Sequence, residues 1–598
     1  MRFPSSHARR ARRARRARRA LLLLAAISLP ASLGAQGTAP AGRLRALADR
    51  VWAWELREDP ISATQAGVYD YDDRLPRVEA ADQRRRADTL ALFLRELAAI
   101  DRAALASGDV VTAEMLELRL RESAEEVQRG TIRVPILADE GFHTSIASLP
   151  RVTPARSAAD VERYARRLAQ VPRYFREYMT WMRKGLADGV TMPRVVLDGY
   201  ETSTTAADAA PRETPFWAPV AALPASVPEA ERRRVAQLVE RVVVDSVRPA
   251  YAAFRKFMVE EYRPRARQTL GARALPDGEA YYRWRIQVYT TLPLEPDSVH
   301  ALGLREVARI RAGMDSARGR AGFKGGHAAF LKFLRTDPRF YAKTPEELLA
   351  HASHIAKRMD YKLPSLFGRL PRQPYGVVPV PAHLAPKYTA GRYSGAPIVG
   401  TRAGEYWVNT YDLPSRPLYN LEALTLHEAV PGHHLQTALA QELGDLPDFR
   451  RHSYLSAFGE GWGLYSEHLG REAGFYTDPY SDFGRLTYEM WRACRLVVDT
   501  GIHWKGWTRQ QAIDYMAANT ALPLREVTTE VDRYISWPGQ ALAYKIGELE
   551  IKALRAEAER ALGDRFDIRA FHDVVLKNGS IPLPTLRREV RAWTAKQR

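Results

Sequence analysis

The sequence predicts a mainly α-helical fold with one small β-sheet. Between residues 43 and 192 apolar side chains recur at the three- and four-residue spacing of helices, as they do at Leu90, Phe93, Leu94 and Leu97. The stretch 376–413 differs because it is rich in Val, Tyr, Pro and Gly, which favours short strands. Beyond residue 445 the helical pattern returns and continues to the end of the chain.

The segment 1–35 has the pattern of a secretory signal peptide. It combines an arginine-rich start, the apolar run LLLLAAISLPASLGA and small residues before Gln36. We therefore expect export to a periplasmic or extracellular location. The alternative, a basic nucleic-acid-binding arm followed by a membrane anchor, is weaker because the apolar run is short for a span and contains Pro30. No cysteine follows the run, so we expect no stable membrane anchor after signal removal.

The formal charge of +19 overstates how basic the mature chain would be. Nine arginines and no acidic residue lie in the predicted signal, so the remainder carries about +10. This excess makes no strong case for nucleic acid as a partner. Cys494 is the single cysteine, so an intramolecular disulfide is excluded and the core must supply the stability.

The first half of the chain predicts an N-terminal helical lobe over residues 36–270. Within it, 199–230 is rich in Ala, Pro and Thr, which indicates a loop or a connection. Helical patterning resumes over 235–262, and Pro264 is expected to end that helix. Further on, Thr344 followed by a proline and two glutamates predicts a helix start.

Three histidines and a carboxylate lie within eight residues, at His427, Glu428, His433 and His434. The common zinc-peptidase motif has two histidines four residues apart on one helix, and its glutamate activates the metal-bound water. Here the residue four after His427 is Pro431, and the next histidines lie six and seven positions on. In a regular helix the i+6 residue lies about 9 Å along the axis, against about 6 Å for i+4, so two imidazoles would not easily share one ion.

A break in the helix would remove this obstacle. Pro431 has no N–H to bond the carbonyl of His427, and Gly432 tolerates unusual dihedral angles. We therefore expect a bulge or kink that brings a later histidine to the position of the second ligand. On this interpretation the stretch 421–436 supplies half of a zinc site, and Glu428 is the general base that activates the water.

The strings HEAVPGHHLQ, EGWGLYSE and YISWPGQALAYKIG follow one another in the second half of the chain. Together they resemble a bacterial family catalogued as domain of unknown function 885, which is regarded as zincin-like. That family is distantly similar to the thimet-oligopeptidase and angiotensin-converting-enzyme groups. The resemblance implies two helical lobes around a deep channel, a small sheet beside the metal-binding helix, one Zn²⁺ ion and a catalytic part over 271–598. Matching the Gly-His pair of these families places the second ligand on His433, with His434 as the alternative.

The third ligand is expected from the segment 456–467. Glu460 lies 27 residues after His433, similar to the spacing in related zincins with a glutamate ligand. Glu467, two turns further along the same face, would hold a ligand imidazole. Glycines 459, 461 and 463 each cost about 1 kcal/mol of helix propensity, so a helix that carries them is expected to approach another backbone closely.

The resemblance also implies a tyrosine that stabilises the tetrahedral intermediate. Tyr544 is the first candidate and Tyr534 the reserve. We assign Arg533 and Tyr534 to substrate binding, and Arg492 and Arg495 could likewise receive a substrate carboxylate. Structural ion pairs are the better explanation for at least two of these three arginines.

We therefore expect an exported zinc peptidase that acts on short peptides. By analogy of fold, its channel would admit extended oligopeptides and exclude folded proteins. In zincins an edge strand pairs with the extended substrate, and residues 406–410 lie where the resemblance puts that strand, although an ordinary hairpin fits equally well. Two alternatives stay open, a zinc hydrolase acting on a non-peptide amide or ester and an exported binding protein without chemistry. The sequence leaves the oligomeric state open.

Overall fold

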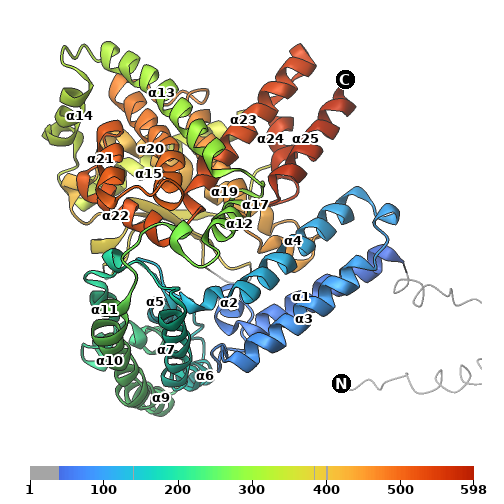
Figure 1. Ribbon diagram of the computed structural model, residues 1–598, viewed down its shortest axis with the longest axis vertical. Helices are drawn as coiled ribbons and strands as arrows, with labels where there is room; N and C mark the ends of the chain where they lie inside the picture. The colour runs from blue at the N-terminus through green and yellow to red at the C-terminus, as the bar shows by residue number, and fades with distance from the viewer. Residues whose placement is uncertain (1–38, 139, 383, 399–401) are drawn as a thin grey trace, which may run out of the picture.

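The structure is a computed structural model that describes residues 39–138, 140–382, 384–398 and 402–598. The predicted signal peptide lies outside the described residues. The chain is mainly helical and carries one three-stranded sheet, as the sequence predicts. In Figure 1 the helices before residue 270 lie in the lower half of the picture and most of the later helices lie above them.

The N-terminal part is a set of packed helices of very different lengths. Its helices are α1 (Pro40–Glu58), α2 (Pro60–Gln65), α3 (Ala80–Ala98), α4 (Ser107–Arg129), α5 (Phe142–Ser148), α6 (Ala158–Leu168), α7 (Val171–Asp188), α8 (Ala218–Ala221), α9 (Glu229–Val242), α10 (Arg248–Phe257) and α11 (Arg263–Arg265). The predicted loop 199–230 contains only short helical turns besides α8.

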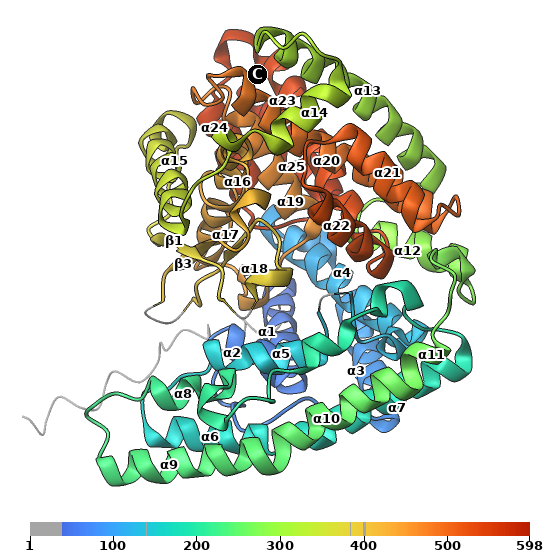
Figure 2. The same cartoon turned by 90° about the vertical axis from the view of Figure 1, so that its left-hand side faces the viewer.

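Helices α9, α10 and α11 form one continuous rod with two π-helical turns, Val243–Val247 and Met258–Tyr262. Figure 2 shows this rod along the bottom of the molecule. Each π-helical turn ends two residues before a proline, Pro249 or Pro264. Because proline has no N–H for the preceding turn, the wider spacing accommodates it. The helix therefore continues through Pro264, where the sequence predicts its end, to Arg265.

The C-terminal part carries the longest helices. They are α12 (Gly278–Thr290), α13 (Pro296–Arg320), α14 (His327–Thr336), α15 (Pro345–Leu366), α16 (Leu421–Glu428), α17 (His433–Gln441), α18 (Asp448–Arg451), α19 (Ser456–Leu469), α20 (Pro479–His503), α21 (Arg509–Asn519), α22 (Leu524–Ser536), α23 (Ala543–Leu562), α24 (Ile568–Leu576) and α25 (Leu583–Gln597). Thr344 caps α15 as predicted, because its hydroxyl accepts from the N–H of Glu347 at 3.2 Å.

Helix α20 is buried along nearly its whole length and forms the centre of the C-terminal part. It packs chiefly against α13, while α19 packs against α23. Its buried charges are paired, for example Glu489 with Lys545 at 3.0 Å and Arg495 with Glu530 at 2.8 Å. Pairing of this kind is what allows charged side chains to lie inside a core.

The sheet lies beside the histidine-bearing helices and has the strand order β1-β3-β2. Strand β1 (Tyr375–Pro379) pairs in parallel with β3 (Gly404–Val408), and β2 (Gly391–Ser394) pairs antiparallel with the other side of β3. The prediction that residues 406–410 form an edge strand is wrong, because β3 is the central strand. Strands β1 and β2 are the two edge strands, and β2 lies against α16.

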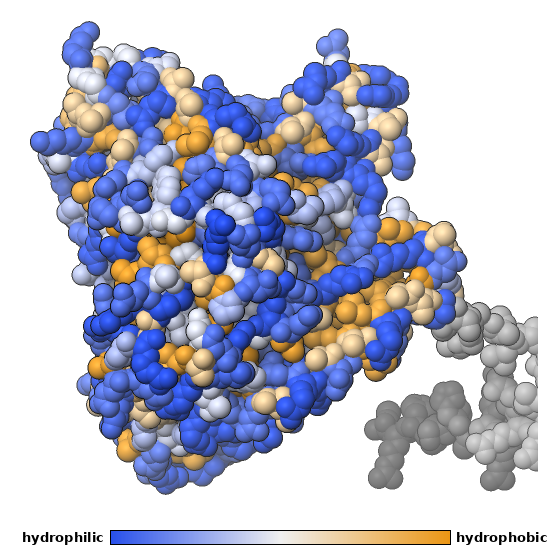
Figure 3. Space-filling view, in the orientation of Figure 1, coloured by the Kyte–Doolittle hydropathy of each residue, from blue (hydrophilic) through white to orange (hydrophobic). Residues whose placement is uncertain are grey.

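Buried hydrophobic side chains from both halves of the chain form one continuous core. The face shown in Figure 3 is mostly hydrophilic, and hydrophobic residues gather on it between α4 and α1. Among the described residues, no helix has the length and apolar character needed to cross a membrane.

Candidate metal centre

The predicted break between the histidines is present. Helix α16 ends at Glu428 and α17 begins at His433. Ala429 and Gly432 leave the helical region with ψ values of −114° and −127°. A Cβ on Gly432 would lie 1.9 Å from the carbonyl oxygen of His427, so only glycine fits this turn. The indole N–H of Trp462 donates to the carbonyl of Pro431 at 2.8 Å and ties the break to α19.

The break brings His427, His433 and Glu460 together. One ligand atom from each lies within 4.8 Å of the other two. The Nε2 atoms of His427 and His433 lie 3.4 Å and 3.3 Å from Oε2 of Glu460. Two imidazole nitrogens and a carboxylate oxygen that converge in this way fit a divalent cation such as zinc and leave a position open. The donors come from α16, α17 and α19, so the arrangement depends on how these three helices pack.

Glu467 holds His427 from behind. Its Oε1 lies 2.7 Å from Nδ1 of His427, which leaves Nε2 facing Glu460. Burial opposes a charge on His427, but hydrogen bonds with Glu460 and Glu467 raise its pKa to about 10. Burial likewise opposes ionisation of Glu460, but the two imidazoles hold the pKa of Glu460 well below its usual value. Carboxylate backing of this kind is typical of metal-binding histidines, and the charge on Glu460 suits a cation.

The glycines of α19 allow the close packing that the triad needs. A Cβ at position 463 would lie 2.7 Å from the ring of His427, and one at 461 would lie 2.5 Å from the backbone of Gly547 on α23. A Cβ at position 459 would meet the ring of Tyr454 at 2.3 Å. The close backbone approach predicted from these glycines is therefore present, and one of them also makes room for a histidine ring.

Glu428 is positioned by β2, one of the two edge strands of the sheet. Its Oε2 accepts a hydrogen bond of 2.8 Å from the backbone N–H of Tyr393 on β2. The carboxylate is 8% exposed and adjoins His427 in sequence, yet Glu428 is not part of the converging triad. Its Oε1 makes no hydrogen bond with a described residue, so that oxygen is available to accept a proton.

His434 faces away from the triad and is occupied on both sides of its ring. Its Nε2 donates to the carbonyl of Gln373 at 3.0 Å, so in the neutral ring Nδ1 accepts from the hydroxyl of Tyr393 at 3.0 Å. Burial lowers the pKa of His434 to about 4 and keeps the ring neutral. His434 therefore links α17 to the sheet, and the structure brings His433, not His434, to the other donors.

Two tyrosines lie near the triad. The hydroxyl of Tyr454 donates to Oε1 of Glu460 at 2.9 Å. Burial and then the neighbouring Glu460 and Tyr544 raise the pKa of Tyr454 well above its usual value. Tyr544 is 6% exposed, and its ring lies under the guanidinium of Arg495 at 4.2 Å. Its hydroxyl makes no hydrogen bond with any described residue, unlike a tyrosine whose hydroxyl is tied into the core.

The structure leaves Tyr534 no surface for a substrate. It is 1% exposed, and its hydroxyl accepts from Trp491 at 2.7 Å and from Arg495 at 2.9 Å. Tyr534 is therefore a core residue, and its assignment to substrate binding needs this correction. Arg495 pairs with Glu530, and Arg492 lies 3.5 Å from Glu467, so both act within the structure as the sequence analysis favoured. Arg533 is partly exposed, with Glu530 at 3.7 Å.

Sequence reasoning missed the roles of Tyr393 and Tyr454. Tyr393 acts through its backbone N–H, which leaves no signature in the residue type. Tyr454 could have been noticed, because it precedes Glu460 by six residues and lies beside the glycine-rich stretch. Its hydrogen bond to Glu460 depends on Gly459, which opens the space for its ring.

Comparisons with known proteins place the chain among bacterial proteins of unknown activity. The family profile described as "Bacterial protein of unknown function (DUF885)" matches residues 60–590. A crystal structure described as "the putative lipoprotein from Colwellia psychrerythraea" is 29% identical, with a TM-score of 0.86, and the match covers 93% of this chain and 100% of that one.

A second solved structure shares the fold at lower identity. It is described as that of "a putative lipoprotein of unknown function from Shewanella oneidensis", is 17% identical with a TM-score of 0.69, and the match covers 92% of this chain and 99% of that one. No curated protein matches the chain.

Proposed function

The chain belongs to the bacterial family of unknown function DUF885, and we propose that in this member the fold carries a zinc-dependent peptidase that hydrolyses short peptides. The observation that carries the proposal is the convergence of His427, His433 and Glu460, with Glu467 behind His427. Two nitrogens and one oxygen leave a fourth position for water, which distinguishes a catalytic from a structural zinc site. The ion, when bound, would supply a Lewis acid that polarises water and the scissile carbonyl.

Glu428 is the proposed general base. Its Oε2 is held by the N–H of Tyr393, while Oε1 is free to take a proton from the attacking water. As the hydroxyl adds to the carbonyl carbon and the C–N bond breaks, Glu428 returns the proton to the leaving amine. The hydrogen bond between the Tyr393 hydroxyl and His434 fixes strand β2, whose backbone N–H orients the carboxylate of Glu428.

Tyr544 is the proposed partner for the oxyanion. Its hydroxyl makes no hydrogen bond with a described residue and is therefore available to donate to the oxyanion, while the guanidinium of Arg495 lies over its ring at 4.2 Å. Tyr454 holds the second oxygen of Glu460, which would keep that carboxylate bound to the ion through one oxygen. Tyr544 is thereby distinguished from Tyr534, whose hydroxyl accepts from Trp491 and Arg495.

The wider arrangement is proposed to be zincin-like, with a channel between the N-terminal and C-terminal parts. A cavity of about 1080 Å³ is lined by residues of both parts and reaches Tyr454. A pocket of this size admits an extended short peptide but not a folded protein. We also propose that the protein is exported, because similar structures are described as lipoproteins and the first residues have the pattern of a signal peptide.

Replacing Glu428 by glutamine tests the mechanism. We expect Glu428→Gln to lower the turnover of a short-peptide mixture at least about a hundredfold while the zinc content stays at one ion per chain. Glu422→Gln, on the same helix, is the matched control and is expected to keep its turnover. An unchanged rate in Glu428→Gln would rule out this base, and loss of zinc from it would make Glu428 a ligand.

The substrate class is tested separately. Zinc-loaded protein is offered a peptide library and, in parallel, small amides and esters, and the products are followed by mass spectrometry. Cleavage of peptides with little action on the small compounds supports the peptidase. Turnover confined to amides or esters would replace it by another zinc hydrolase, and stoichiometric zinc without any turnover would favour a binding protein.

A further inference from the structure

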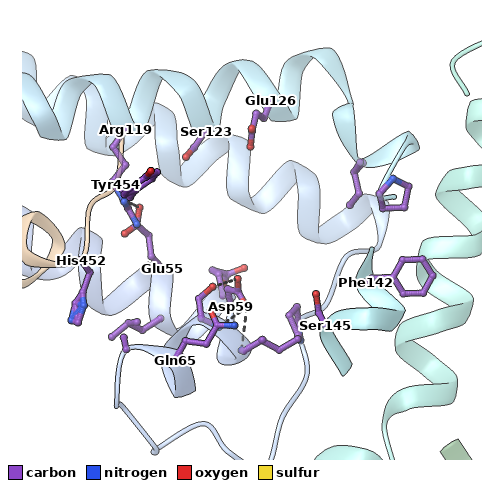
Figure 4. Close-up of a pocket in the computed structure, with 18 of the residues that line it drawn as sticks. Glu55, Asp59, Gln65, Arg119, Ser123, Glu126, Phe142, Ser145, His452 and Tyr454 are labelled. Atoms are coloured by element: carbon purple, nitrogen blue, oxygen red, sulfur yellow. Dashed lines mark hydrogen bonds and ion pairs between the residues drawn. The ribbon is translucent and has the colours of Figure 1, made fainter. Parts of the chain in front are cut away.

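A large chamber begins beside the candidate metal centre. From the C-terminal part it is lined by one face of α17, which follows His433, and by Tyr454. From the N-terminal part it is lined by α1, α2 and α4 (Figure 4). The ring of His452, two residues before Tyr454, stacks on Trp52 of α1 at 5.1 Å. One end of the chamber therefore lies at Tyr454, which bonds Glu460 of the triad, and the chamber extends from there along the N-terminal helices.

Gln436 lines this chamber with an amide that nothing in the described structure satisfies. Its Oε1 is buried without a partner, its Nε2 makes no hydrogen bond with a described residue, and the residue is only 3% exposed. An unsatisfied buried polar group destabilises the fold, and folded proteins seldom keep one without a reason. Gln436 lies three residues after His433 on α17, where a bound substrate would supply the missing partner.

Two other acceptors in the chamber lining also lack donors. Oε1 of Glu55 accepts from Arg119 at 2.6 Å, but its Oε2 has no partner. The Nε2 of Gln441 donates to the carbonyl of Ala396, so its orientation is fixed and its Oε1 is left without a partner. A ligand that brings N–H donors would satisfy both acceptors.

Two donors in the lining are also unpaired, namely Nε2 of Gln83 and Nε of Arg285. Arg285 is nevertheless engaged through its other atoms, because it donates to the hydroxyl of Tyr289 and lies over the ring of Trp284 at 5.3 Å. Gln83 is an amide whose two ends are interchangeable, so it does not fix the polarity of the ligand.

Helix α4 presents Arg119, Ser123 and Glu126 to the chamber, as Figure 4 shows. Arg119 is already paired with Glu55, but Glu126 makes no ion pair within the described part of the chain. Burial raises the pKa of Glu126, and Arg285 only partly offsets this. The chamber therefore holds, at the end of α4 away from Arg119, a carboxylate that forms no direct ion pair with a described residue and has Arg285 as a neighbouring cation.

Aromatic side chains complete the walls. Phe142 stacks on Tyr178 at 4.6 Å, and Trp52, Trp54 and Tyr174 line the same space. Aromatic faces beside a carboxylate favour an aliphatic chain that ends in a positive charge, through apolar contact and cation–π attraction.

We propose that this chamber binds the amino-terminal side of a peptide and that Glu126 receives an alkylammonium group, while Gln436 bonds the peptide backbone nearer the triad. The inference rests on the proposed peptidase function. Arg119 and Glu126 are seven residues apart, which is about 10 Å along α4 and equals about three extended residues. The ammonium group is therefore expected about three residues from the part of the peptide that lies beside Arg119. It comes either from the peptide terminus or from a lysine side chain.

Binding to zinc-loaded Glu428→Gln protein tests the inference without turnover. The probes are Ala-Ala-Ala, acetyl-Ala-Ala-Ala, acetyl-Lys-Ala-Ala and acetyl-norleucyl-Ala-Ala, titrated by calorimetry. Adding Glu126→Gln is expected to weaken the binding of ammonium-bearing probes about tenfold and to leave acetyl-Ala-Ala-Ala unchanged. Selective loss for Ala-Ala-Ala identifies the peptide terminus as the source, and selective loss for acetyl-Lys-Ala-Ala identifies the side chain.

Glu125→Gln is the matched control, because it removes the same charge from the next residue of α4, which pairs with Arg129 at 2.7 Å and does not line the chamber. Equal effects of Glu125→Gln and Glu126→Gln, or equal effects of Glu126→Gln on every probe, would overturn the inference. If the peptides bind selectively but wild-type protein cleaves none, the peptidase proposal fails while the site stands.

Gln436→Leu supplies a second, independent test. Because the amide has no partner among the described residues, removing it is expected to leave the unfolding temperature unchanged or raised, while peptide binding weakens about fivefold. A clear drop in unfolding temperature with unchanged peptide binding would show that the amide serves the fold and would overturn its role in binding.

Discussion

At the scale of single residues, the centre depends on groups that fix the orientation of others. Glu467 sets which nitrogen of His427 faces the triad, and Tyr454 occupies one oxygen of Glu460. Tyr393 acts through its backbone on Glu428, and His434 in turn anchors the hydroxyl of Tyr393. Supporting bonds of this kind hold the candidate metal-binding side chains in a usable geometry before an ion binds.

The carboxylate of Glu467 is expected to raise the affinity for zinc. In Glu467→Gln the amide oxygen still accepts from Nδ1 of His427, but the charge that makes the imidazole a stronger ligand is lost. We expect zinc affinity to fall about tenfold, as measured by competition with a chelator of known affinity. Glu472→Gln, just beyond α19, is the control and is expected to bind zinc like the wild type. A loss as large as that of His433→Ala would instead make Glu467 a ligand.

The two neighbouring histidines are expected to behave differently when replaced. His433→Ala should lose stoichiometric zinc, whereas His434→Ala should keep it, because both nitrogens of His434 are engaged with Gln373 and Tyr393. With Tyr393 released, Glu428 is held less firmly, so turnover by His434→Ala is expected to fall about tenfold with little change in KM. Metal analysis of both variants decides the point, and zinc loss confined to His434→Ala would reverse the assignment.

Much of this centre could be predicted from residue types, and some could not. His427, His433 and Glu460 stand out because metal ligands are a small set of residue types and because Pro431 and Gly432 signal the break that reconciles their spacing. The burial of Tyr534 could not be predicted, since a tyrosine on a helix has the same sequence signature in a core and in a cleft. The hydroxyl of Tyr534 is occupied because Trp491 and Arg495, which lie on α20, both donate hydrogen bonds to it.

At the scale of elements, α19 is shaped by what it must approach. Its glycines at positions 459, 461 and 463 let it lie against Tyr454, against α23 and against the ring of His427. The sequence predicts the helix and the need for a close approach, because glycine lowers helix propensity without a local gain. It does not say which neighbour each glycine meets. The same holds for the strand order, because the composition of 376–413 indicates short strands but not that β3 lies in the middle of the sheet.

Adding one methyl group at position 463 is expected to disrupt the centre. In Gly463→Ala the new Cβ would lie 2.7 Å from the imidazole of His427, so α19 or the ring must move. We expect zinc affinity to fall more than tenfold and the unfolding free energy to fall by about 1–3 kcal/mol. Gly461→Ala meets the backbone of Gly547 and is expected to cost similar stability with a smaller loss of zinc. Gly444→Ala, which has open space, is the neutral control, and equal zinc affinity in all three variants would exclude this packing role.

At the scale of the whole molecule, buried polar side chains join segments that are distant in the sequence. Asp499 lies fully buried in α20, where the hydroxyl of Tyr282 on α12 donates to it at 2.6 Å. The N–H of Gly539, in the loop before α23, donates to the same carboxyl at 3.2 Å. Asp499 therefore joins three segments that flank the chamber and the centre. Burial outweighs these bonds and raises the pKa of Asp499 from 3.8 to about 7.

This raised pKa predicts how stability depends on pH. In the folded chain Asp499 keeps its proton until about pH 7, whereas in the unfolded chain it loses the proton near pH 3.8, so its effect on stability becomes less favourable as pH rises between these values.

Asp499→Asn keeps a neutral acceptor for Tyr282 and Gly539 and cannot ionise. We expect the variant to unfold at a temperature about 2 °C or more above the wild type at pH 8, with a smaller gap at pH 5. Thermal unfolding in chelator measures this without metal, and Asp514→Asn on the surface of α21 is the control. A gap that is larger at pH 5 than at pH 8 would mean that Asp499 is ionised in the folded chain and that its charge is satisfied there.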